Sequence, residues 1–404
     1  MIKEDDDTEK KISEREVIRL MRDLISIPSP YFEEEKIITF VHNWFQDNEI
    51  EARVHKYSDD KVTNFNGRNI VSVIEGKEKG TTVCLNGHLD TVRLSNGWSA
   101  DPFGGEIKDG MIYGVGALDM KSGCCAIMLA LRKFVRENSE FKGKIITTLV
   151  SDEEGPYGLG TNAVIEDGLL EDVDFSIVAE PSACFSGKGF PNLCLGARGG
   201  YGLEVEFFGK SAHAALPSDG KSAAIDAAKV VCALENVDYI EDPFLGRGTV
   251  CVLAVESDGG ACSVPDYAKI KLFWHIVVGE NEDTITEEIK KAIVRAGIQC
   301  DYKISFREAP SEGSRGFMPY IVEKENPYVE AFIQSVEAVC GASPTVSYFQ
   351  SIGDFNYLGS RIGAPVVIFG ADGRRFHSDD ECADINSIVK TAGTIYDFLV
   401  KTLV

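Results

Sequence analysis

The chain has 404 residues, of which 44% are hydrophobic, and a formal net charge of −23. Its length exceeds that of a typical single domain, so we expect two domains with ordinary globular cores. The negative charge disfavours binding to nucleic acid or to anionic membranes, and no apolar run is long enough to cross a bilayer.

The N-terminus and the cysteines both indicate a reducing compartment. Residues 1–7 are acidic and lack the apolar core of a signal peptide. The eleven cysteines are scattered and form no C-x-x-C motif, which favours buried free thiols over a disulfide framework. We therefore expect a cytoplasmic protein.

Helical and strand-like segments alternate in the first half of the chain. Apolar residues recur with helical spacing over 12–27 and 33–47, and a largely buried helix is expected at 123–135. Apolar, strand-like runs occupy 70–74, 82–85, 145–150 and 175–179. Strands separated by helices are typical of a mostly parallel sheet that is covered by helices on both faces.

The pattern changes near Arg198. Residues 203–208 alternate apolar and acidic side chains, as a half-exposed strand does, and could form a sheet edge. Two helices are expected in this part, at 222–235 and 284–296, and two further strands, at 249–255 and 268–278. They predict an α+β module with antiparallel pairing.

The last part of the chain returns to the first pattern. A helix is expected at 327–339, a strand at 366–369 and a terminal helix from residue 385. The predicted fold class is therefore α/β, with a mostly parallel sheet flanked by helices. Residues 1–197 and 311–404 form this domain, and an α+β domain of residues 198–310 is inserted into it.

A histidine and an aspartate follow the strand at 82–85. His88 and Asp90 are two residues apart, so both side chains lie on one face of an extended chain. A neutral imidazole can bind a metal through one nitrogen and donate its other N–H to a carboxylate. A capped turn with a surface histidine is the alternative that this stretch alone leaves open.

Four further polar clusters lie beyond apolar strands or in a glycine-rich loop. They contain Asp119, the pair Glu153 and Glu154, Glu180, and His377. Taken singly, each is explained as a turn residue, a solvated or loop acid or, for His377, a surface histidine. Ligands bind beyond the carboxyl ends of strands in open α/β sheets, so the shared placement favours one site. A phosphate loop is the weaker alternative, because the glycine-rich loop lacks a lysine-serine ending.

This set of side chains suits a site for two metal ions. Imidazole and carboxylate ligands bind Zn, and also Mn or Co. Two metals about 3.5–4 Å apart need a bridging group, which one carboxylate can supply, and terminal ligands on each ion. A further carboxylate must stay off the metals to accept a proton from water. The adjacent Glu153 and Glu154 could divide these two tasks.

In combination, the motifs resemble those of the co-catalytic zinc peptidase and deacylase family. This family includes acetylornithine deacetylase, succinyl-diaminopimelate desuccinylase, aminoacylase, dipeptidases and glutamate carboxypeptidase. The motifs are Gly-His-Leu-Asp-Thr-Val at 87–92, the run from Gly114 to Lys121, Asp-Glu-Glu-Gly at 152–155 and Glu-Pro at 180–181. The resemblance extends from residue 27 to the last helix.

The resemblance implies a role for each cluster and a cofactor of two divalent metal ions per chain, Zn first and Co or Mn as alternatives. The implied roles are terminal ligands for His88, Glu154, Glu180 and His377, the bridge for Asp119, the general base for Glu153 and the orientation of His88 for Asp90. It also implies a cis peptide bond after Asp119.

Residues 198–310 resemble the lid and dimerisation domain of this family. The resemblance implies that His213 reaches the active site of a partner subunit and stabilises the oxyanion there, although a surface histidine is the simpler alternative. Arg198 matches an arginine that contacts a substrate carboxylate in some members. Three positions depart from the family pattern: Cys262 replaces an asparagine, His275 replaces an arginine, and Gly353 replaces a hydroxyl residue before Asp354.

We therefore expect a dinuclear metal-dependent hydrolase that cleaves the amide bond of a small N-acyl amino acid. A metallo-dipeptidase or aminopeptidase would use the same residues and is the first alternative. A non-catalytic binding protein on the same fold is the second. The expected partners are a small amide substrate and a second copy of the chain, with no nucleic acid and no membrane.

Overall fold

The computed structural model describes residues 11–404, and the chain forms two compact units. The larger unit comprises Met1–Ala197 and Ile321–Val404, and the inserted unit is Arg198–Tyr320. The return to the larger unit comes later than residue 311, because the backbone of Phe317 still pairs with Gly200 of the inserted unit. The acidic residues 1–7, on which the prediction of localisation rests, lie outside the described range.

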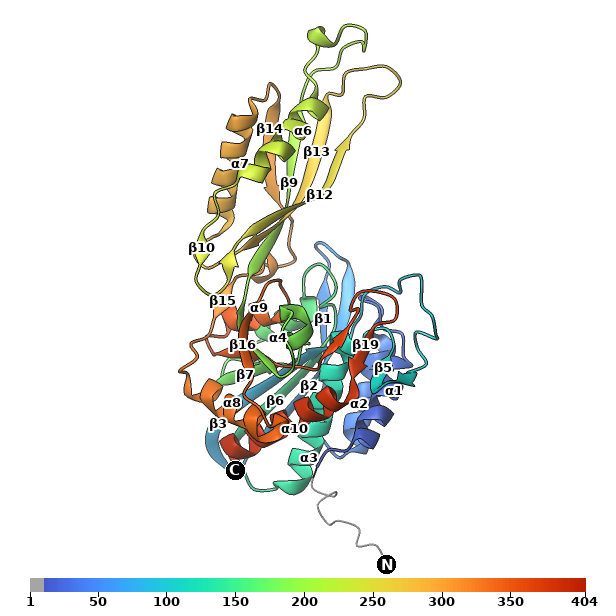
Figure 1. The fold of residues 1–404 in the computed structure, drawn as a ribbon, viewed down its shortest axis with the longest axis vertical. Helices are drawn as coiled ribbons and strands as arrows, with labels where there is room; N and C mark the ends of the chain where they lie inside the picture. Colours follow the sequence, from blue (N-terminus) through green and yellow to red (C-terminus); the bar gives the residue numbers. More distant parts are fainter. Residues whose placement is uncertain (1–10) are drawn as a thin grey trace, which may run out of the picture. The chain divides into compact units, whose positions relative to one another are not determined.

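The larger unit is built on a nine-stranded sheet (Figure 1). Its strands are β1 (Arg53–Asp59), β2 (Phe65–Glu75), β3 (Glu78–His88), β6 (Lys142–Val150), β7 (Phe175–Val178), β8 (Asn192–Ala197), β15 (Tyr320–Ile321), β16 (Thr345–Phe349) and β17 (Val366–Ile368). The order is β1-β2-β6-β3-β7-β17-β8-β15, and β16 pairs with β8. Strands β6, β3, β7 and β17 run parallel, as predicted for the centre. The sheet as a whole is mixed, because β1 and β2 add antiparallel pairs at one side and β17 pairs antiparallel with β8 at the other.

Helices flank this sheet (Figure 1). They are α1 (Glu14–Ile25), α2 (Glu35–Asp47), α3 (Ser122–Glu137), α4 (Leu159–Glu166), α5 (Ser182–Ser186), α8 (Pro327–Cys340), α9 (Asp354–Arg361) and α10 (Ile385–Leu403). Helix α3 is apolar over most of its length and is buried between α1, α10 and β3, as its sequence predicts. No helix in the described range is long and apolar enough to cross a bilayer.

A small second sheet belongs to the same unit. It has the order β18-β19-β5-β4, with β4 (Ile107–Lys108), β5 (Met111–Tyr113), β18 (Gly373–Arg374) and β19 (Cys382–Asp384). It joins the loop before α3 to the chain around His377, because Cys382 pairs with both Tyr113 and Arg374. Two segments that carry predicted site residues are thereby connected.

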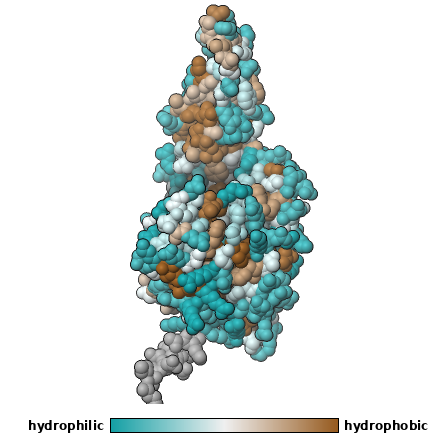
Figure 2. Space-filling model, turned by 90° about the vertical axis from the view of Figure 1, so that its right-hand side faces the viewer, coloured by the Kyte–Doolittle hydropathy of each residue, from teal (hydrophilic) through white to brown (hydrophobic). Residues whose placement is uncertain are grey.

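The inserted unit is an antiparallel sheet with two helices. Its elements are β9 (Gly199–Phe208), α6 (Ala223–Ala233), β10 (Glu241–Asp242), β11 (Gly246–Arg247), β12 (Thr249–Ser257), β13 (Tyr267–Ile276), α7 (Glu282–Ala296) and β14 (Asp301–Phe306). The main sheet has the order β12-β13-β9-β14, and its buried residues form a core with those of α6 and α7. In Figure 2, hydrophobic side chains gather on the face of this unit that the view shows.

The expectation that residues 203–208 could form a sheet edge is wrong. These residues belong to β9, which pairs with β13 on one side and with β14 on the other. The alternation has a different cause: Leu203, Val205 and Phe207 face the core, while Glu204 and Glu206 remain partly exposed. The edge strands of this sheet are β12 and β14.

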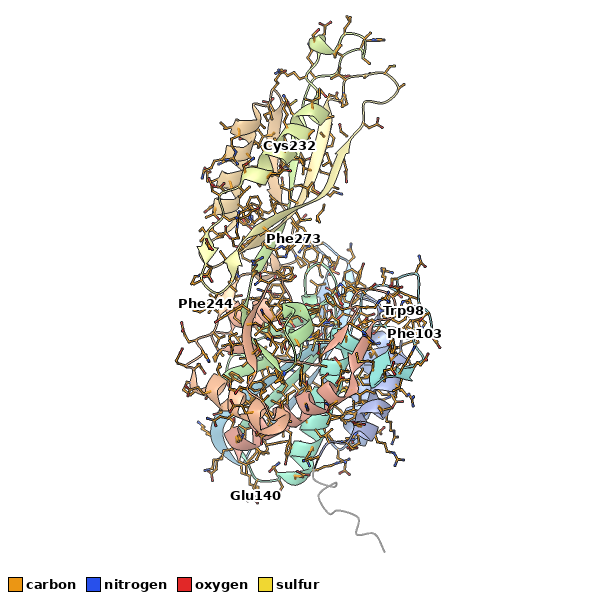
Figure 3. The ribbon with its side chains drawn as sticks, viewed as in Figure 1. Trp98, Phe103, Glu140, Cys232, Phe244 and Phe273 are labelled. Carbon is orange, nitrogen blue, oxygen red and sulfur yellow. The ribbon has the colours of Figure 1, made fainter. Side chains whose placement is uncertain are left out.

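All eleven cysteines are free thiols, and all lie within the described residues. They are not uniformly buried, since Cys232 on α6 is exposed (Figure 3). The absence of disulfides among them agrees with the expectation drawn from their scattered positions.

Candidate metal centre

Apart from Asp119, which lies in the loop before α3, the predicted site residues of the larger unit follow four neighbouring parallel strands. β3 ends at His88, β6 is followed by Glu153 and Glu154, and β7 is followed by Glu180. His377 follows β17, the next strand in the sheet. Since parallel strands bring their carboxyl ends to the same edge of a sheet, residues far apart in the chain meet there.

Two groups of possible metal ligands share one aspartate. His88, Asp119 and Glu180 form the first group, and Asp119, Glu154 and His377 form the second. Nε2 of His88 lies 3.3 Å from Oδ1 of Asp119 and 3.4 Å from Oε1 of Glu180. Nε2 of His377 lies 3.2 Å from Oδ2 of Asp119 and 2.8 Å from Oε1 of Glu154. The two oxygens of Asp119 therefore face different groups, as a bridging carboxylate requires.

These residues fit a pair of divalent metal ions. Each group offers one imidazole nitrogen and two carboxylates, the ligand types that zinc and similar metals accept. Oε2 of Glu180 is buried without a hydrogen-bond partner, although buried polar atoms are normally satisfied. A cation between these side chains would supply the missing partner.

The tautomer of His88 also fits a role as a metal ligand. Its Nδ1 lies 3.0 Å from the backbone oxygen of Asp90, and since a carbonyl only accepts, Nδ1 carries the hydrogen in the neutral ring. The lone pair is then on Nε2, which faces Asp119 and Glu180. The backbone of Asp90 thus makes the shorter contact with His88, and the Asp90 carboxylate lies 3.6 Å from Nδ1.

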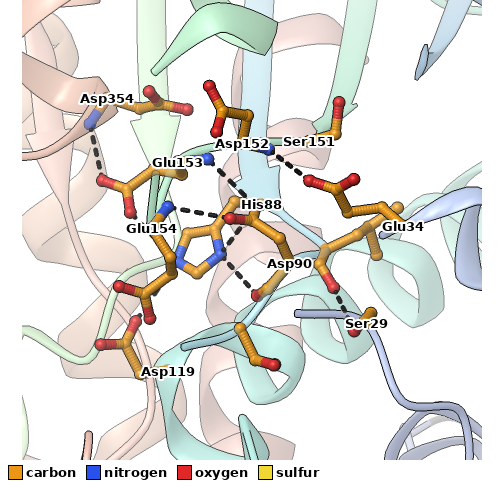
Figure 4. A network of polar contacts seen from close by, with 12 residues as sticks. Ser29, Glu34, His88, Asp90, Asp119, Ser151, Asp152, Glu153, Glu154 and Asp354 are labelled. Atoms are coloured by element: carbon orange, nitrogen blue, oxygen red, sulfur yellow. Dashed lines mark hydrogen bonds and ion pairs between the residues drawn. The ribbon is translucent and has the colours of Figure 1, made fainter. Parts of the chain in front are cut away.

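The carboxylate of Asp90 has other partners (Figure 4). It accepts the backbone N–H groups of Glu153, at 3.1 Å, and of Glu154, at 2.8 Å. Glu34 accepts the N–H of Asp152 in the same loop, at 3.0 Å. Two buried carboxylates therefore fix the backbone from which Glu153 and Glu154 project. Glu34 was not found from the sequence, because its partner is a backbone group in a loop that is distant in the chain.

The loop that carries Asp119 is held by a carboxylate that the sequence analysis also missed. Glu381 is buried and accepts the N–H groups of Gly116, Leu118 and Asp119, at 2.9, 2.9 and 3.0 Å. The Asp119–Met120 peptide bond is cis, as the resemblance implied. In the sequence, Glu381 is one acid in the run 379–381 close to His377, and only that closeness signals it.

Glu153 and Glu154 are neighbours with different surroundings. Oε1 of Glu154 contacts His377, whereas Oε1 of Glu153 accepts the N–H of Asp354 at 3.1 Å. Oε2 of Glu153 lies 3.7 Å from Nε2 of His88, a longer distance than those within the two ligand groups. Glu154 therefore belongs to one group of possible ligands, and Glu153 lies beside both groups.

The cluster concentrates negative charge in a buried place. Burial, reinforced by the charge of Asp119, raises the pKa of Glu154 to about 8 and that of Glu180 to about 7. Burial also raises the pKa of Glu153 well above its usual value. Burial alone would raise the pKa of Asp119 as well, but hydrogen bonds from His377 and His88 lower it. Bound cations would allow these carboxylates to be ionised together.

His213 and Arg198 lie in the inserted unit and belong to neither ligand group. His213 is exposed beside a β-bridge to Ser263, and its Nδ1 accepts the N–H of Ala215 at 3.1 Å. Arg198 is partly buried and donates to the backbone oxygen of Leu245 at 2.9 Å. His275 on β13 has its ring 4.9 Å from that of Phe273, which is labelled in Figure 3.

Comparison with known proteins identifies a family whose model matches this chain. The model of peptidase family M20/M25/M40 matches residues 84–401. The chain is 27% identical over 330 residues to the succinyl-diaminopimelate desuccinylase of Sulfurovum sp. (strain NBC37-1), covering 80% of this chain and 84% of that protein.

Solved structures agree with the fold. A tripeptidase from Staphylococcus aureus has a TM-score of 0.79 and 19% identity, covering 97% of this chain and 99% of its own. A dinuclear metal-binding peptidase from Bacillus subtilis has a TM-score of 0.68 and 16% identity, covering 96% and 99%. At these identities the likeness concerns the fold, and the chemistry rests on the residues described above.

Proposed function

Because the chain belongs to peptidase family M20/M25/M40, we propose that it is a dinuclear metal-dependent hydrolase that cleaves the amide bond of a small N-acyl amino acid. Catalysis by a metal-dependent amide hydrolase is the activity common to the family match and the desuccinylase relatives. The observation that carries the proposal is the pair of ligand groups that share Asp119, with Glu153 beside them.

The metals are proposed to be held by the two groups, with Asp119 between them. His88 and Glu180 are the terminal ligands on one side, and Glu154 and His377 are those on the other. When bound, such ions polarise the amide carbonyl and lower the pKa of a water molecule at the site. The side chains suit zinc best, with cobalt or manganese as alternatives.

Glu153 is proposed to move the proton. Its carboxylate lies outside both ligand groups and accepts a hydrogen bond from the N–H of Asp354. It takes the proton of the attacking water and passes it to the nitrogen of the leaving amine, so the carboxylate is restored at the end of the cycle. Asp90 and Glu34 contribute by fixing the backbone of the loop that carries it.

The class of substrate rests on the relatives and on the inserted unit. The curated relatives include desuccinylases, which act on an acyl group attached to an amino acid, as their names state. Arg198 is proposed to contact a substrate carboxylate, and His213 to stabilise the oxyanion from a partner subunit. His275 cannot form the two-pronged contact that an arginine forms, so the substrate is expected to differ from that of relatives with arginine there.

Two further proposals concern the cellular compartment and the oligomeric state. The protein acts in the cytoplasm, because free thiols persist in a reducing compartment. It is a homodimer, because isologous dimers are the commonest closed assemblies and the inserted unit exposes large hydrophobic side chains such as Ile225 and Leu253.

A substrate screen tests the function. Chelator-treated protein is reloaded with Zn, Co or Mn and offered N-acetyl and N-succinyl amino acids, dipeptides and tripeptides, with Glu153→Gln as the matched inactive control. Metal-dependent release of the free amino acid from acyl compounds is expected. Turnover of dipeptides or tripeptides alone would instead identify a peptidase, and no turnover of any amide by the metal-loaded protein would favour a binding protein.

A further inference from the structure

The hydrogen bond between Glu153 and Asp354 distinguishes the two oxygens of the Glu153 carboxylate (Figure 4). Oε1 accepts the N–H of Asp354 at 3.1 Å. Asp354 is the first residue of α9, where a backbone N–H has no partner within the helix and is free to bind another group. Oε2 is left on the side of the ligand cluster, 3.7 Å from Nε2 of His88.

The residue before Asp354 leaves room for this contact only because it is glycine. A Cβ atom at Gly353 would lie 2.9 Å from Oε1 of Glu153 and 2.5 Å from the ring of Phe355. Gly353 has φ 177° and ψ −172°, an extended conformation that any residue can adopt, so space and not backbone conformation requires glycine here. Phe355 is buried against Phe349, so its ring cannot move away freely.

Two hydrogen bonds also fix the start of α9 to the segment that follows Glu153. Oδ2 of Asp354 accepts the hydroxyl of Thr161 on α4 at 2.5 Å, and α4 begins soon after the Glu153 loop. Tyr357 on α9 donates to the backbone oxygen of Tyr157 in that connection, at 3.0 Å. The N–H of Asp354 therefore has a defined position relative to the backbone of Glu153.

We propose that Gly353 and the N–H of Asp354 are positioning elements for the general base. They hold Oε1 of Glu153, keep its carboxylate out of the ligand set and leave Oε2 facing the reaction. This inference rests on the proposed function, since it assigns a support to the base that the function requires.

A steric test uses two glycines. Gly353→Ala is expected to displace the Glu153 carboxylate and to lower kcat by about 10², with KM and bound metal unchanged, because a displacement of about 1 Å costs this order. Gly189→Ala is the matched control, since a Cβ there meets nothing within 4 Å and the substitution is expected to leave kcat unchanged. Equal kcat values for the two variants would overturn the inference.

A second pair of variants removes the N–H directly. Proline is tolerated at the first position of a helix but has no N–H, so Asp354→Pro deletes the donor, whereas Asp354→Ala keeps it. Both remove the carboxylate that binds Thr161. We expect the proline variant to have the lower kcat at equal metal content and equal helical circular dichroism, and equal kcat values would contradict the proposed contact.

Crystal structures of the metal-loaded variants separate this inference from the proposed function. We expect the Glu153 carboxylate to lose its contact with the backbone of residue 354 in Gly353→Ala and Asp354→Pro. We expect it to keep this contact in Gly189→Ala and Asp354→Ala. A Glu153 carboxylate that stays in place in all four variants would refute the inference. If the wild-type protein hydrolyses no amide, the proposed function fails. The position of the Glu153 carboxylate in the four variant structures still shows whether the contact with residue 354 holds it.

Discussion

Adjacent residues with the same side chain have opposite surroundings at the centre of this site. Glu154 contacts His377, and the carboxylate of Glu153 is bound by the backbone of Asp354. Both depend on Asp90, whose carboxylate accepts both of their N–H groups. Successive side chains of an irregular loop point in different directions. The buried Asp90 carboxylate can therefore hold one stretch of backbone from which Glu153 and Glu154 reach different partners.

Exchanging each glutamate for glutamine separates these tasks. Glu153→Gln is expected to retain both metal ions and to lose about 10²–10⁴ in turnover, the usual cost of removing a general base. Glu154→Gln is expected to lose metal, because an amide is a poorer ligand than a carboxylate. Metal analysis beside turnover measurements checks both variants, and the reverse pattern would show that the two roles are exchanged.

The site residues that the sequence predicts share one property: each lies close to the end of an apolar strand or within a glycine-rich loop. His88 and Glu180 were found in this way, because the position of a strand end can be inferred from the pattern of apolar residues. Glu381 and Glu34 could not be found, since they bind backbone N–H groups across 262 and 118 residues of sequence. A backbone group leaves no signature in a sequence.

At the scale of elements, the loop before α3 depends on the turn that follows His377. Glu381 binds three N–H groups of the Asp119 loop and lies next to β19, which pairs with β5 at the start of that loop. One buried carboxylate therefore joins the segment with Asp119 to the segment with His377.

Glu381→Gln should loosen this junction. A glutamine offers one acceptor oxygen and turns an NH₂ group toward a backbone N–H, so at least one buried donor loses its partner, at a cost of about 1–3 kcal/mol in the free energy of unfolding. We expect weaker metal binding in a calorimetric titration and a lower melting temperature. Asp379→Asn is the control, because Asp379 binds Arg375 at the surface of the same turn. Equal metal affinity in the two variants would contradict the account.

The elements also show where pattern analysis fails. The alternation at 203–208 correctly predicts a strand with one buried face but not its place within the sheet, because a central strand covered by helices on one face alternates like an edge strand. The parallel centre of the larger sheet is predicted correctly, since its apolar runs are buried on both faces. The antiparallel β1 and β2 follow from pairings that local patterns do not encode.

At the scale of the whole molecule, the two units have separate cores, and only the larger one carries the ligand groups. Metal binding should therefore stabilise the larger unit, by about 2.7 kcal/mol for a site at a free metal concentration of 100 times Kd. Differential scanning calorimetry with and without chelator measures this. A melting profile that is unchanged by chelator would contradict the proposed site.

The role of His213 can also be tested only in the whole assembly. His213→Ala is expected to lose about 10²–10³ in turnover with its metal content unchanged, as for the loss of one oxyanion donor. If His213 acts on a partner subunit, mixing it with inactive Glu153→Gln under subunit exchange should restore activity, because one site of each mixed dimer has both residues intact. A monomeric mass in solution, or no recovery despite proven exchange, would exclude action across subunits.

The central claim is that two metal ions share Asp119 while Glu153 stays outside their coordination. An anomalous-difference map from zinc-loaded crystals measures this directly. We expect two peaks per chain, one beside His88 and Glu180 and the other beside Glu154 and His377, with the Asp119 carboxylate between them and Glu153 bound to the N–H of Asp354. A single peak, or a Glu153 oxygen within bonding distance of a metal, would contradict the account.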